Sequence, residues 1–485
     1  MNKNGLVFDV EDKPKFAQVL VFALQQLLAI MAATIAVPAI IGNGMSASAA
    51  LFGAGVGTIV YLLFTKFKSP VFLGSSFAFL GSMSAAFAGG VSMSAGYLGL
   101  IIGAVFAGLV YVIIAIIVKF AGVKWVDKIM PAVVIGPTVA IIGLSLAGNA
   151  VKDLVGGSAG FVGFDSASSS YIMNGEGLAC LCCGIVTLAV TIICSVYGKK
   201  FIKMIPFVIG IAAGYIVATV FTLCGVKIID FSKFNNIQWY PDFTFVEAFF
   251  KGSYDFNGGS LGSYIGTIAV AYVPVAFVVF AEHIADHKNL STIIGRDLLK
   301  NPGLHRTLLG DGIGSIAGAF FGGCPNTTYG ESVGCVAISG NASVITILTT
   351  AVMAIVISFI GPFSTFLATI PSCVMGGVCI ALYGFIAVSG LKMIQKVDLN
   401  DNSNLFVVSV ILISGVGTLC LTFGKIKLTA VACSLILGIL TNLICSKARK
   451  KSENACDNCT EDKSEETCKA CKENAEAAST QDENK

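Results

Sequence analysis

Charged side chains are scarce in this sequence. Asp, Glu, Lys and Arg make up 12% of its 485 residues, whereas hydrophobic residues make up 55%. A soluble globular protein would carry about twice that charged fraction, so most of the surface is expected to face lipid instead of water. The formal net charge of +3 is too small to suggest a nucleic-acid partner.

The sequence also lacks the signs of an exported, disulfide-bonded protein. Twelve of its sixteen cysteines lie in or next to apolar segments, where a thiol behaves as a small hydrophobic group. No cleavable signal peptide is expected, because the N-terminus is rich in charges and the first apolar run, 16–41, is long enough to span a bilayer.

Motifs typical of an enzyme are missing as well. No Ser/His/Asp cluster and no HExxH motif is present, and AEHIADH (281–287) has the wrong order for a zinc protease. We therefore expect neither an enzyme nor a bound cofactor.

What the sequence has in abundance is apolar runs. Runs of about 17–25 residues predict about fourteen transmembrane segments, and the expected fold class is an all-α polytopic membrane protein. The predicted segments are 16–41, 47–64, 71–88, 98–119, 131–148, 178–198, 204–225, 263–284, 308–323, 326–340, 343–361, 371–390, 404–423 and 428–446. The segments near 71–88 and 308–340 are short or rich in Gly, Ser and Thr.

The distribution of Lys and Arg predicts the orientation. With a cytoplasmic N-terminus, 25 of the 31 basic residues fall on the inside and six on the outside, in agreement with the positive-inside rule. Both termini are therefore expected in the cytoplasm, and the protein in the plasma (inner) membrane.

Two segments resemble each other across the halves of the chain. In IMPAVVIGPTVAIIGLSLAG (129–148) and TIPSCVMGGVCIALYGFIAVSG (369–390), Pro131 matches Pro371 and Gly136 matches Gly376. They are seven spans apart and enter from opposite faces, which indicates an inverted repeat. The expected parts are an N-terminus (1–15), a first repeat (16–225), an extracellular loop (226–262), a second repeat (263–446) and a tail (447–485).

The third and tenth spans correspond under the same shift. They read FLGSSFAFLG (72–81) and CPNTTYGESVG (324–334). Backbone that departs from helix at membrane depth must be buried in protein or line a polar cavity, and matched interruptions point to a central binding site. Close helix packing through small residues is the alternative, but Pro325 and Glu331 do not serve it.

Few acids lie in the predicted spans. Glu282 ends the eighth, Asp286 follows one helical turn later on the same side, and Glu331 lies in the tenth. A charge at mid-bilayer costs roughly 2.5–3.5 kcal/mol, so such an acid faces a cavity, is paired, or is protonated. No basic residue lies in a span interior, so the carboxyl groups suit a cation or a solute with N–H donors.

Other polar residues near these spans have alternative interpretations. Asp311 either lies in the ninth span as a functional acid or caps its helix. His283 and His287 are either ligands or proton relays, or, as is more usual at a membrane edge, simply solvated. His305 is given no chemical role.

The motifs CPNTTYGESVG, AEHIADHKNL and FLGSSFAFL resemble the nucleobase–ascorbate transporter family (nucleobase:cation symporters), and within it the bacterial uracil permeases. The resemblance covers roughly residues 14–446. It implies fourteen spans in two inverted seven-span repeats, core and gate domains, and short strands in spans 3 and 10. It also implies proton-coupled import of a nucleobase by alternating access, in a homodimer.

The resemblance implies roles for particular residues. Glu282 and Glu331 match acids that hydrogen-bond the base, and Glu282 would serve proton coupling. Asp286 replaces a family His, so if that His tunes coupling, the coupling here either uses Asp286 or differs. The remaining expected substrate-binding residues are Phe77 and Gly330, through backbone amides, with Tyr329 beside the site and Tyr383 on the gate side.

The sequence departs from that family at two positions. Asp286 stands where uracil permeases usually carry His, and Ser332 stands where many relatives have Asn. Relatives that take xanthine or uric acid often have Gln in place of Glu331, which favours uracil here. A purine permease, or an anion carrier of the same architecture, remains the alternative.

The tail after residue 446 is polar and mixed in charge, and it is expected to be disordered. Two CxxC pairs lie in it, Cys456/Cys459 and Cys468/Cys471. Four thiolates could hold Zn²⁺, but the spacing is shorter than usual, so these residues are only weak candidates for a metal site.

Overall fold

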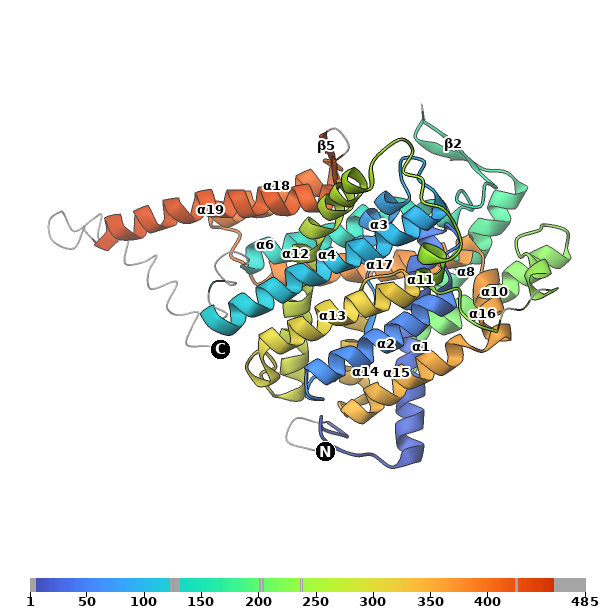
Figure 1. The fold of residues 1–485 in the computed structure, drawn as a ribbon, viewed down its shortest axis with the longest axis horizontal. Helices are drawn as coiled ribbons and strands as arrows, with labels where there is room; N and C mark the ends of the chain where they lie inside the picture. The colour runs from blue at the N-terminus through green and yellow to red at the C-terminus, as the bar shows by residue number, and fades with distance from the viewer. Residues whose placement is uncertain are drawn as a thin grey trace.

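The computed structural model describes residues 6–122, 125, 131–166, 168–199, 202, 205–235, 237, 239–423 and 426–457. These residues form a mostly helical bundle with small two-stranded sheets (Figure 1). Within these ranges, eight helices are long and apolar enough to cross a membrane, or nine if one bent pair is counted as a single span.

The first half of the chain alternates long helices with short breaks. Its principal elements are α1 (Phe16–Ile41), α2 (Ala47–Phe64), β1 (Leu73–Ser75), η1 (Phe77–Phe79), α3 (Leu80–Ala86), α4 (Met93–Ala121), α6 (Ala132–Ser145), α7 (Ala147–Leu154), β2 (Gly163–Asp165), β3 (Ser170–Ile172), α8 (Gly175–Tyr197) and α10 (Pro206–Leu223).

The second half follows a similar order after a loop with short helical turns. Its elements are η2 (Phe231–Asn235), α11 (Thr244–Phe249), α12 (Leu261–Ile294), η3 (Leu299–Gly303), α13 (Leu304–Gly322), β4 (Asn326–Thr328), α14 (Gly330–Ser339), α15 (Val344–Ser358), α16 (Gly361–Thr369), α17 (Ser372–Ile394), α18 (Asn402–Val416), β5 (Leu421–Phe423), β6 (Ile426–Leu428) and α19 (Ala430–Asp457).

The two interrupted segments contain the strands that position the site. β1 and β4 pair antiparallel, with Leu73 opposite Thr328 and Ser75 opposite Asn326. Each strand leads into the start of a helix, β1 into η1 and α3, and β4 into α14. The strand pair thus joins residues far apart in the sequence. Its hydrogen bonds satisfy the backbone N–H and C=O groups where the chain is not helical.

The helices fall into two groups by their contacts. α2 packs between α13 and α15, while α13 also packs on α4, and α4 on α12 (Figure 1). In the other group, α17 packs on α6, α7 and α8, α8 packs on α10, and α18 packs on α6 and α19. The strand pair belongs to the first group, and α1 contacts both.

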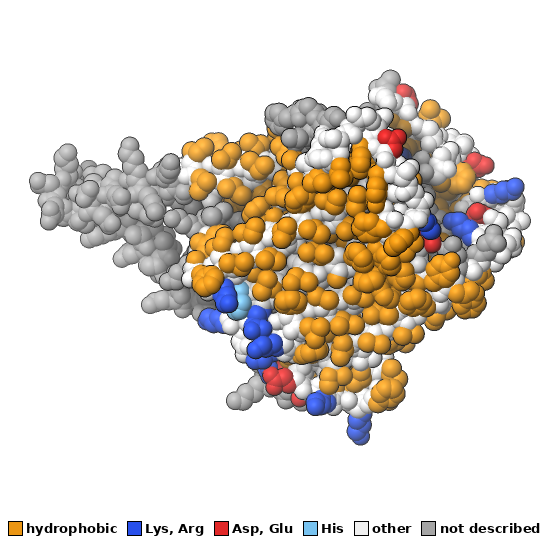
Figure 2. Space-filling model, viewed as in Figure 1, with side chains coloured by type: hydrophobic (Ala, Val, Ile, Leu, Met, Phe, Trp, Pro, Cys, Tyr) orange, Lys and Arg blue, Asp and Glu red, His pale blue; other side chains and the backbone are white. Residues whose placement is uncertain are grey.

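The surface matches the scarcity of charge. Hydrophobic side chains cover most of the face in Figure 2, and Lys and Arg side chains lie along its lower left edge and at its right-hand end. On α4, Leu109, Ile113 and Ile116 are exposed. Such a continuous apolar exterior is what a lipid environment requires.

Glycines allow α2 and α13 to approach closely. A Cβ atom placed on Gly53 would meet the backbone of Gly318, and one placed on Gly57 would meet the backbone of Gly314. The side-chain amide of Asn326 also donates to the carbonyl of Gly53, at 2.9 Å. The position of β4 therefore depends on this helix contact.

We expect Gly53→Ala to destabilise the protein, because the added methyl group must push the α13 backbone away. Overpacking of this kind costs about 1–3 kcal/mol, and we expect the melting temperature of the purified protein to fall by roughly 3–10 °C. Gly148→Ala is the matched control, since a Cβ atom there meets nothing within 4 Å. Equal melting temperatures for the two variants would contradict the close contact.

The chain beyond the last expected span extends further as helix. α19 continues to Asp457 instead of ending near residue 446. Cys456 lies in its last turn, while Cys459, Cys468 and Cys471 lie outside the described residues, so the weak metal-site prediction stays a prediction.

Candidate functional site

A cavity of about 370 Å³ lies where the two strand–helix junctions meet α12. This volume is within the range typical of small-molecule sites. Five of the expected substrate-binding residues and Asp286 line it: Phe77, Glu282, Asp286, Tyr329, Gly330 and Glu331. Its opposite wall comes from the second helix group, through residues such as Ile142, Phe207, Phe385 and Ser389.

The α12 wall presents two acids. Glu282 and Asp286 are four residues apart, so both lie on the helix face turned to the cavity. Thr328, at the end of β4, donates its hydroxyl proton to Asp286 Oδ2 at 2.9 Å. This bond connects α12 to the strand pair and orients the Asp286 carboxyl group.

The third acid comes from the start of α14. Gly330 is the first residue of that helix, and Glu331 lies in its first turn. A negative side chain is stabilised there by the helix dipole and by N–H groups that have no partner within the helix. Three carboxyl groups from two elements therefore converge on one cavity.

Backbone donors accompany these acids. Phe77 begins η1 and Gly330 begins α14, and both residues line the cavity. The first N–H groups of a helix lack intrahelical acceptors, so both junctions offer donors to a carbonyl oxygen of a ligand. The cavity therefore offers both hydrogen-bond acceptors and donors, and the start of α14 supplies one of each.

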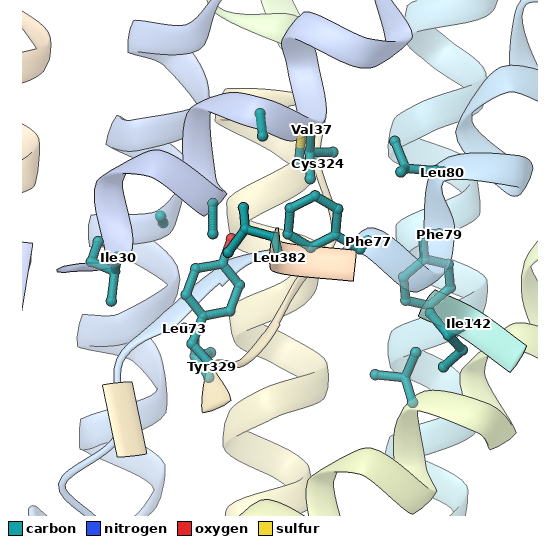
Figure 3. Packing of buried hydrophobic residues seen from close by; sticks show 14 of the residues in the cluster. Ile30, Val37, Leu73, Phe77, Phe79, Leu80, Ile142, Cys324, Tyr329 and Leu382 are labelled. Carbon is teal, nitrogen blue, oxygen red and sulfur yellow. The ribbon is translucent and has the colours of Figure 1, made fainter. Parts of the chain in front are cut away.

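The two tyrosines occupy different places. Tyr329 lines the cavity and donates its hydroxyl proton to the carbonyl of Ser75, at 2.8 Å. Tyr383 is not among the lining residues; its ring packs edge-on against Phe77, with centroids 5.5 Å apart. Figure 3 shows Phe77 and Tyr329 within the surrounding cluster of buried hydrophobic side chains.

A second cavity, of about 940 Å³, adjoins the first. The two share Phe77, Ala78 and Ile142 as lining residues. Since Tyr383 supports the Phe77 ring from the α17 side, these aromatic rings stand at the boundary between the two spaces.

Ser332, one of the departures noted in the sequence, lies behind the cavity. Its hydroxyl oxygen accepts from Gln26 Nε2 at 2.5 Å and from the backbone N–H of Phe72 at 3.0 Å. It therefore holds α1, α14 and the residue before β1 together and does not line the cavity.

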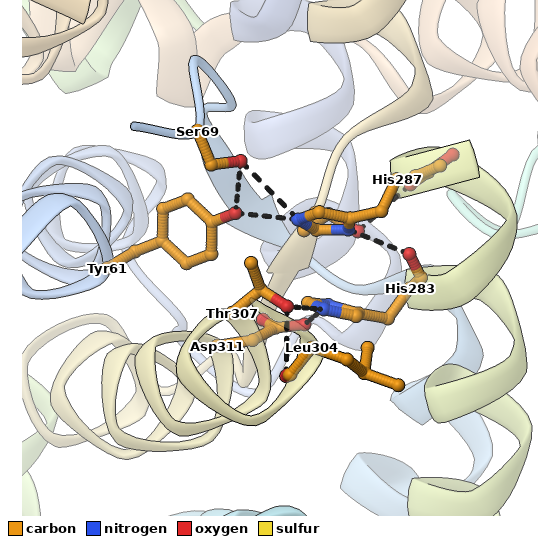
Figure 4. Close-up of polar contacts among 9 residues, drawn as sticks. Tyr61, Ser69, His283, His287, Leu304, Thr307 and Asp311 are labelled. Atoms are coloured by element: carbon orange, nitrogen blue, oxygen red, sulfur yellow. Dashed lines mark hydrogen bonds and ion pairs between the residues drawn. The ribbon is translucent and has the colours of Figure 1, made fainter. Parts of the chain in front are cut away.

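Sequence reasoning was wrong about the two histidines of α12. Solvation was the more usual of the alternatives given for them, but His283 is 1% and His287 0% exposed. Their partners are buried too: His283 Nδ1 lies 2.7 Å from Asp311 Oδ2, and His287 Nε2 lies 2.7 Å from the Tyr61 hydroxyl (Figure 4).

The capping alternative for Asp311 was also wrong. α13 begins at Leu304, so Asp311 lies two turns inside the helix. A signal was available: positions 283 and 287 share a helix face that is turned about 100° from the face of positions 282 and 286. Among the described residues, no group of three or more His, Cys, Asp or Glu is arranged to hold a metal ion.

Comparison with known proteins gives a consistent result. The model of the Permease family matches residues 17–423. The uracil permease of Bacillus caldolyticus is 39% identical, covering 93% of this chain and 97% of that protein. The uracil permease of Bacillus subtilis (strain 168) is 37% identical over 94% and 99%, and that of Escherichia coli (strain K12) is 34% identical over 90% and 93%.

Solved structures share the fold at low identity. The transmembrane domain of a cyanobacterium bicarbonate transporter, BicA, aligns with a TM-score of 0.59 at 15% identity, over 90% of this chain and 99% of that one. The murine anion transporter Slc26a9, in its inward-facing state, aligns with a TM-score of 0.63 at 13% identity, over 90% and 70%.

Proposed function

This chain belongs to the Permease family, and we propose that it is a uracil permease of a cell's plasma membrane. Its relatives are transporters and not enzymes, and its helices are those of a multi-pass membrane protein. The observation that carries the substrate assignment is the combination of relatives called uracil permeases with a cavity that offers carboxyl acceptors and backbone donors.

The chemistry of uracil fits this cavity. The planar ring has N–H donors and carbonyl acceptors along its edge. Glu282 and Glu331 would accept from the N–H groups, and the amides of Phe77 and Gly330 would donate to the carbonyl oxygens. A matched set of partners matters because a buried polar group left unpaired costs about 1–3 kcal/mol.

The fourteen-span, inverted-repeat architecture is part of the proposal. The contacts between helices support it, because they repeat when each predicted span is exchanged for the span seven places away. The contact of α4 with α13 corresponds to that of α15 with α2, and the contact of α17 with α8 corresponds to that of α6 with α18. Pro131 and Pro371 are the N-caps of α6 and α17, both with extended backbone. The first helix group would form the core domain and the second the gate domain.

Transport would proceed by alternating access with a proton as the coupling ion and without a cofactor. Uracil would enter through the 940 Å³ cavity on one side of Phe77 and leave through the 370 Å³ cavity on the other. Glu282, with Asp286 beside it, would take up a proton on the outside and release it inside as the two domains rock. Tyr383 would act from the gate side by supporting Phe77.

The orientation in the membrane and the assembly are also part of the proposal. The excess of Lys and Arg in the predicted inside loops supports cytoplasmic termini. We propose a homodimer as the working assembly, on the resemblance to the nucleobase–ascorbate transporter family.

Two other substrates remain as alternatives. A purine such as xanthine would fit the same fold and is the closer competitor. The structural neighbours include anion transporters, but three carboxyl groups in the cavity, with no Lys or Arg among its lining residues, oppose an anionic substrate.

Uptake into proteoliposomes tests the proposal. We expect labelled uracil to accumulate when the outside is more acidic than the inside, and only to equilibrate without a pH gradient. An excess of unlabelled uracil should abolish the signal, while xanthine or bicarbonate should compete weakly. Stronger competition by xanthine than by uracil would assign the protein to purines instead.

A further inference from the structure

A buried polar network lies behind α12, on a helix face turned about 100° from Glu282 and Asp286. It consists of His283 and His287 on α12, Thr307 and Asp311 on α13, Tyr61 on α2, and Ser69 before β1 (Figure 4). Each of these side chains is at most 1% exposed, and none of them lines the cavity. The function proposed above gives this network no role.

Hydrogen-bond donors and acceptors in the network can be counted. Thr307 has one hydroxyl proton, and its oxygen lies 3.1 Å from the carbonyl of Leu304 and 3.0 Å from His283 Nε2. Since a carbonyl only accepts, the Thr307 proton goes to Leu304, and His283 Nε2–H donates to Thr307. A second proton then lies between His283 Nδ1 and Asp311 Oδ2, which are 2.7 Å apart.

This count makes the His283–Asp311 pair electrically neutral. Its two protons correspond either to a neutral imidazole with a carboxylic acid or to an imidazolium with a carboxylate. Asp311 Oδ1 is buried without a hydrogen-bond partner among the described residues, so an unbalanced negative charge there would be costly.

The second histidine, His287, packs directly against the first. His287 Nδ1 donates to the carbonyl of His283 at 2.8 Å, while the Tyr61 hydroxyl lies 2.7 Å from His287 Nε2 and donates its own proton to Ser69 Oγ, also at 2.7 Å. The two imidazole rings stack with centroids 4.0 Å apart. The neighbouring ionisable groups are Tyr61 on α2, Tyr111 on α4 and, on the adjoining face of α12, Glu282 and Asp286.

We propose that His283 and Asp311 are positioning residues for the substrate cavity. Their shared proton ties the back of α12 to α13 and so fixes the rotation of α12 that turns Glu282 and Asp286 towards the cavity. Within the described part of the chain, no hydrogen bond joins this network to the cavity acids, so the shared proton is separate from the transported one. This inference rests on the proposed function for its substrate.

Equilibrium binding of labelled uracil to the purified full-length protein tests the pair. We expect His283→Ala and Asp311→Ala each to weaken binding by at least about tenfold, and the double variant to bind no more than about threefold more weakly than either single variant, because both changes break one link. Asp311→Asn keeps a neutral donor to His283 and should bind within about threefold of the wild type.

The pH profile separates positioning from proton transfer. Uracil uptake by Asp311→Asn should keep the wild-type pH midpoint, since the transported proton does not pass through this pair. A shifted midpoint, unchanged binding by folded single variants, or additive losses in the double variant would each overturn the inference. His305→Gln is the matched control, because that histidine lies outside the network and should bind as the wild type does.

A measurement without substrate tests the positioning role even if the protein does not bind uracil. Amide hydrogen exchange along α12 should become faster in His283→Ala and in Asp311→Ala, while His305→Gln leaves it unchanged. If the wild type binds no uracil, the proposed function fails, and unchanged exchange in the variants would still overturn the positioning role.

Discussion

Glu282→Gln is expected to abolish the accumulation of uracil driven by a pH gradient. Glutamine has nearly the same shape and keeps a carbonyl oxygen that accepts from an N–H group of the base, but it cannot take up or release a proton. We therefore expect concentrative uptake into proteoliposomes to fall at least about 100-fold. Exchange of labelled for unlabelled uracil across the membrane should persist, because it needs no net proton movement.

The comparison of accumulation with exchange makes this test specific. A variant that had merely misfolded would lose both activities together. Glu176→Gln, at the exposed start of α8, is the matched control and should retain both. Wild-type accumulation by Glu282→Gln would reject Glu282 as the coupling residue and leave Asp286 as the next candidate.

Glu331→Gln is expected to damage uracil affinity more than any other single change of this size. The glutamine carbonyl can still accept from the base, but a hydrogen bond to a carboxylate is stronger than one to a neutral amide, and the amide N–H groups are left without an acceptor. An unpaired buried donor costs about 1–3 kcal/mol, which corresponds to roughly 5- to 150-fold in the dissociation constant. The loss of negative charge in the first turn of α14 adds to this effect.

The specificity of Glu331→Gln provides a second measurement. Because relatives that take purines often carry Gln at this position, we expect xanthine to compete better against uracil uptake in the variant than in the wild type. Thr328→Ser, which keeps the hydroxyl donor to Asp286, is a neighbouring control that should leave the order of substrates unchanged. Equal uracil affinity in Glu331→Gln and wild type would remove Glu331 from the binding site.

Apolar runs and helix-capping residues predicted much of the bundle. The predicted spans 16–41 and 47–64 coincide with α1 and α2, since Ser46 caps α2 and Gly42 ends α1 with a positive φ. Hydropathy failed where a helix outlasts its apolar run: α12 continues to Ile294, ten residues past the predicted end at 284. In that extension His287 is buried and contacts Tyr61, whereas Lys288, Asn289 and Thr292 are exposed.

The residues that line the candidate site were predicted better than the residues that pack behind them. Glycine and hydroxyl residues in two corresponding segments indicated the interrupted helices, and Glu282, Asp286 and Glu331 do line one cavity. Tyr383, in contrast, contacts Phe77 and does not reach the lining. That distinction depends on the packing of α17, which no local sequence pattern reveals.

The network behind α12 escaped prediction for a physical reason. A histidine near a membrane edge is solvated or buried according to what packs on its face of the helix, and the partners of His283 come from 24 and 28 residues away in the chain. Gly312 of α13 packs against Gly108 of α4 and brings Asp311 deep into the bundle. Single-residue propensities carry no information about such contacts.

The antiparallel pairing of β1 with β4 also has a consequence for biosynthesis. The two strands are about 250 residues apart in the chain, which at a synthesis rate of roughly 5–20 residues per second amounts to roughly 12–50 seconds. During that interval the nascent β1 segment has unpaired peptide groups, which hydrocarbon cannot solvate. Until β4 has been made, that segment must therefore stay at the translocon or in water. The capacity to bind uracil can arise only after Thr328 has been added.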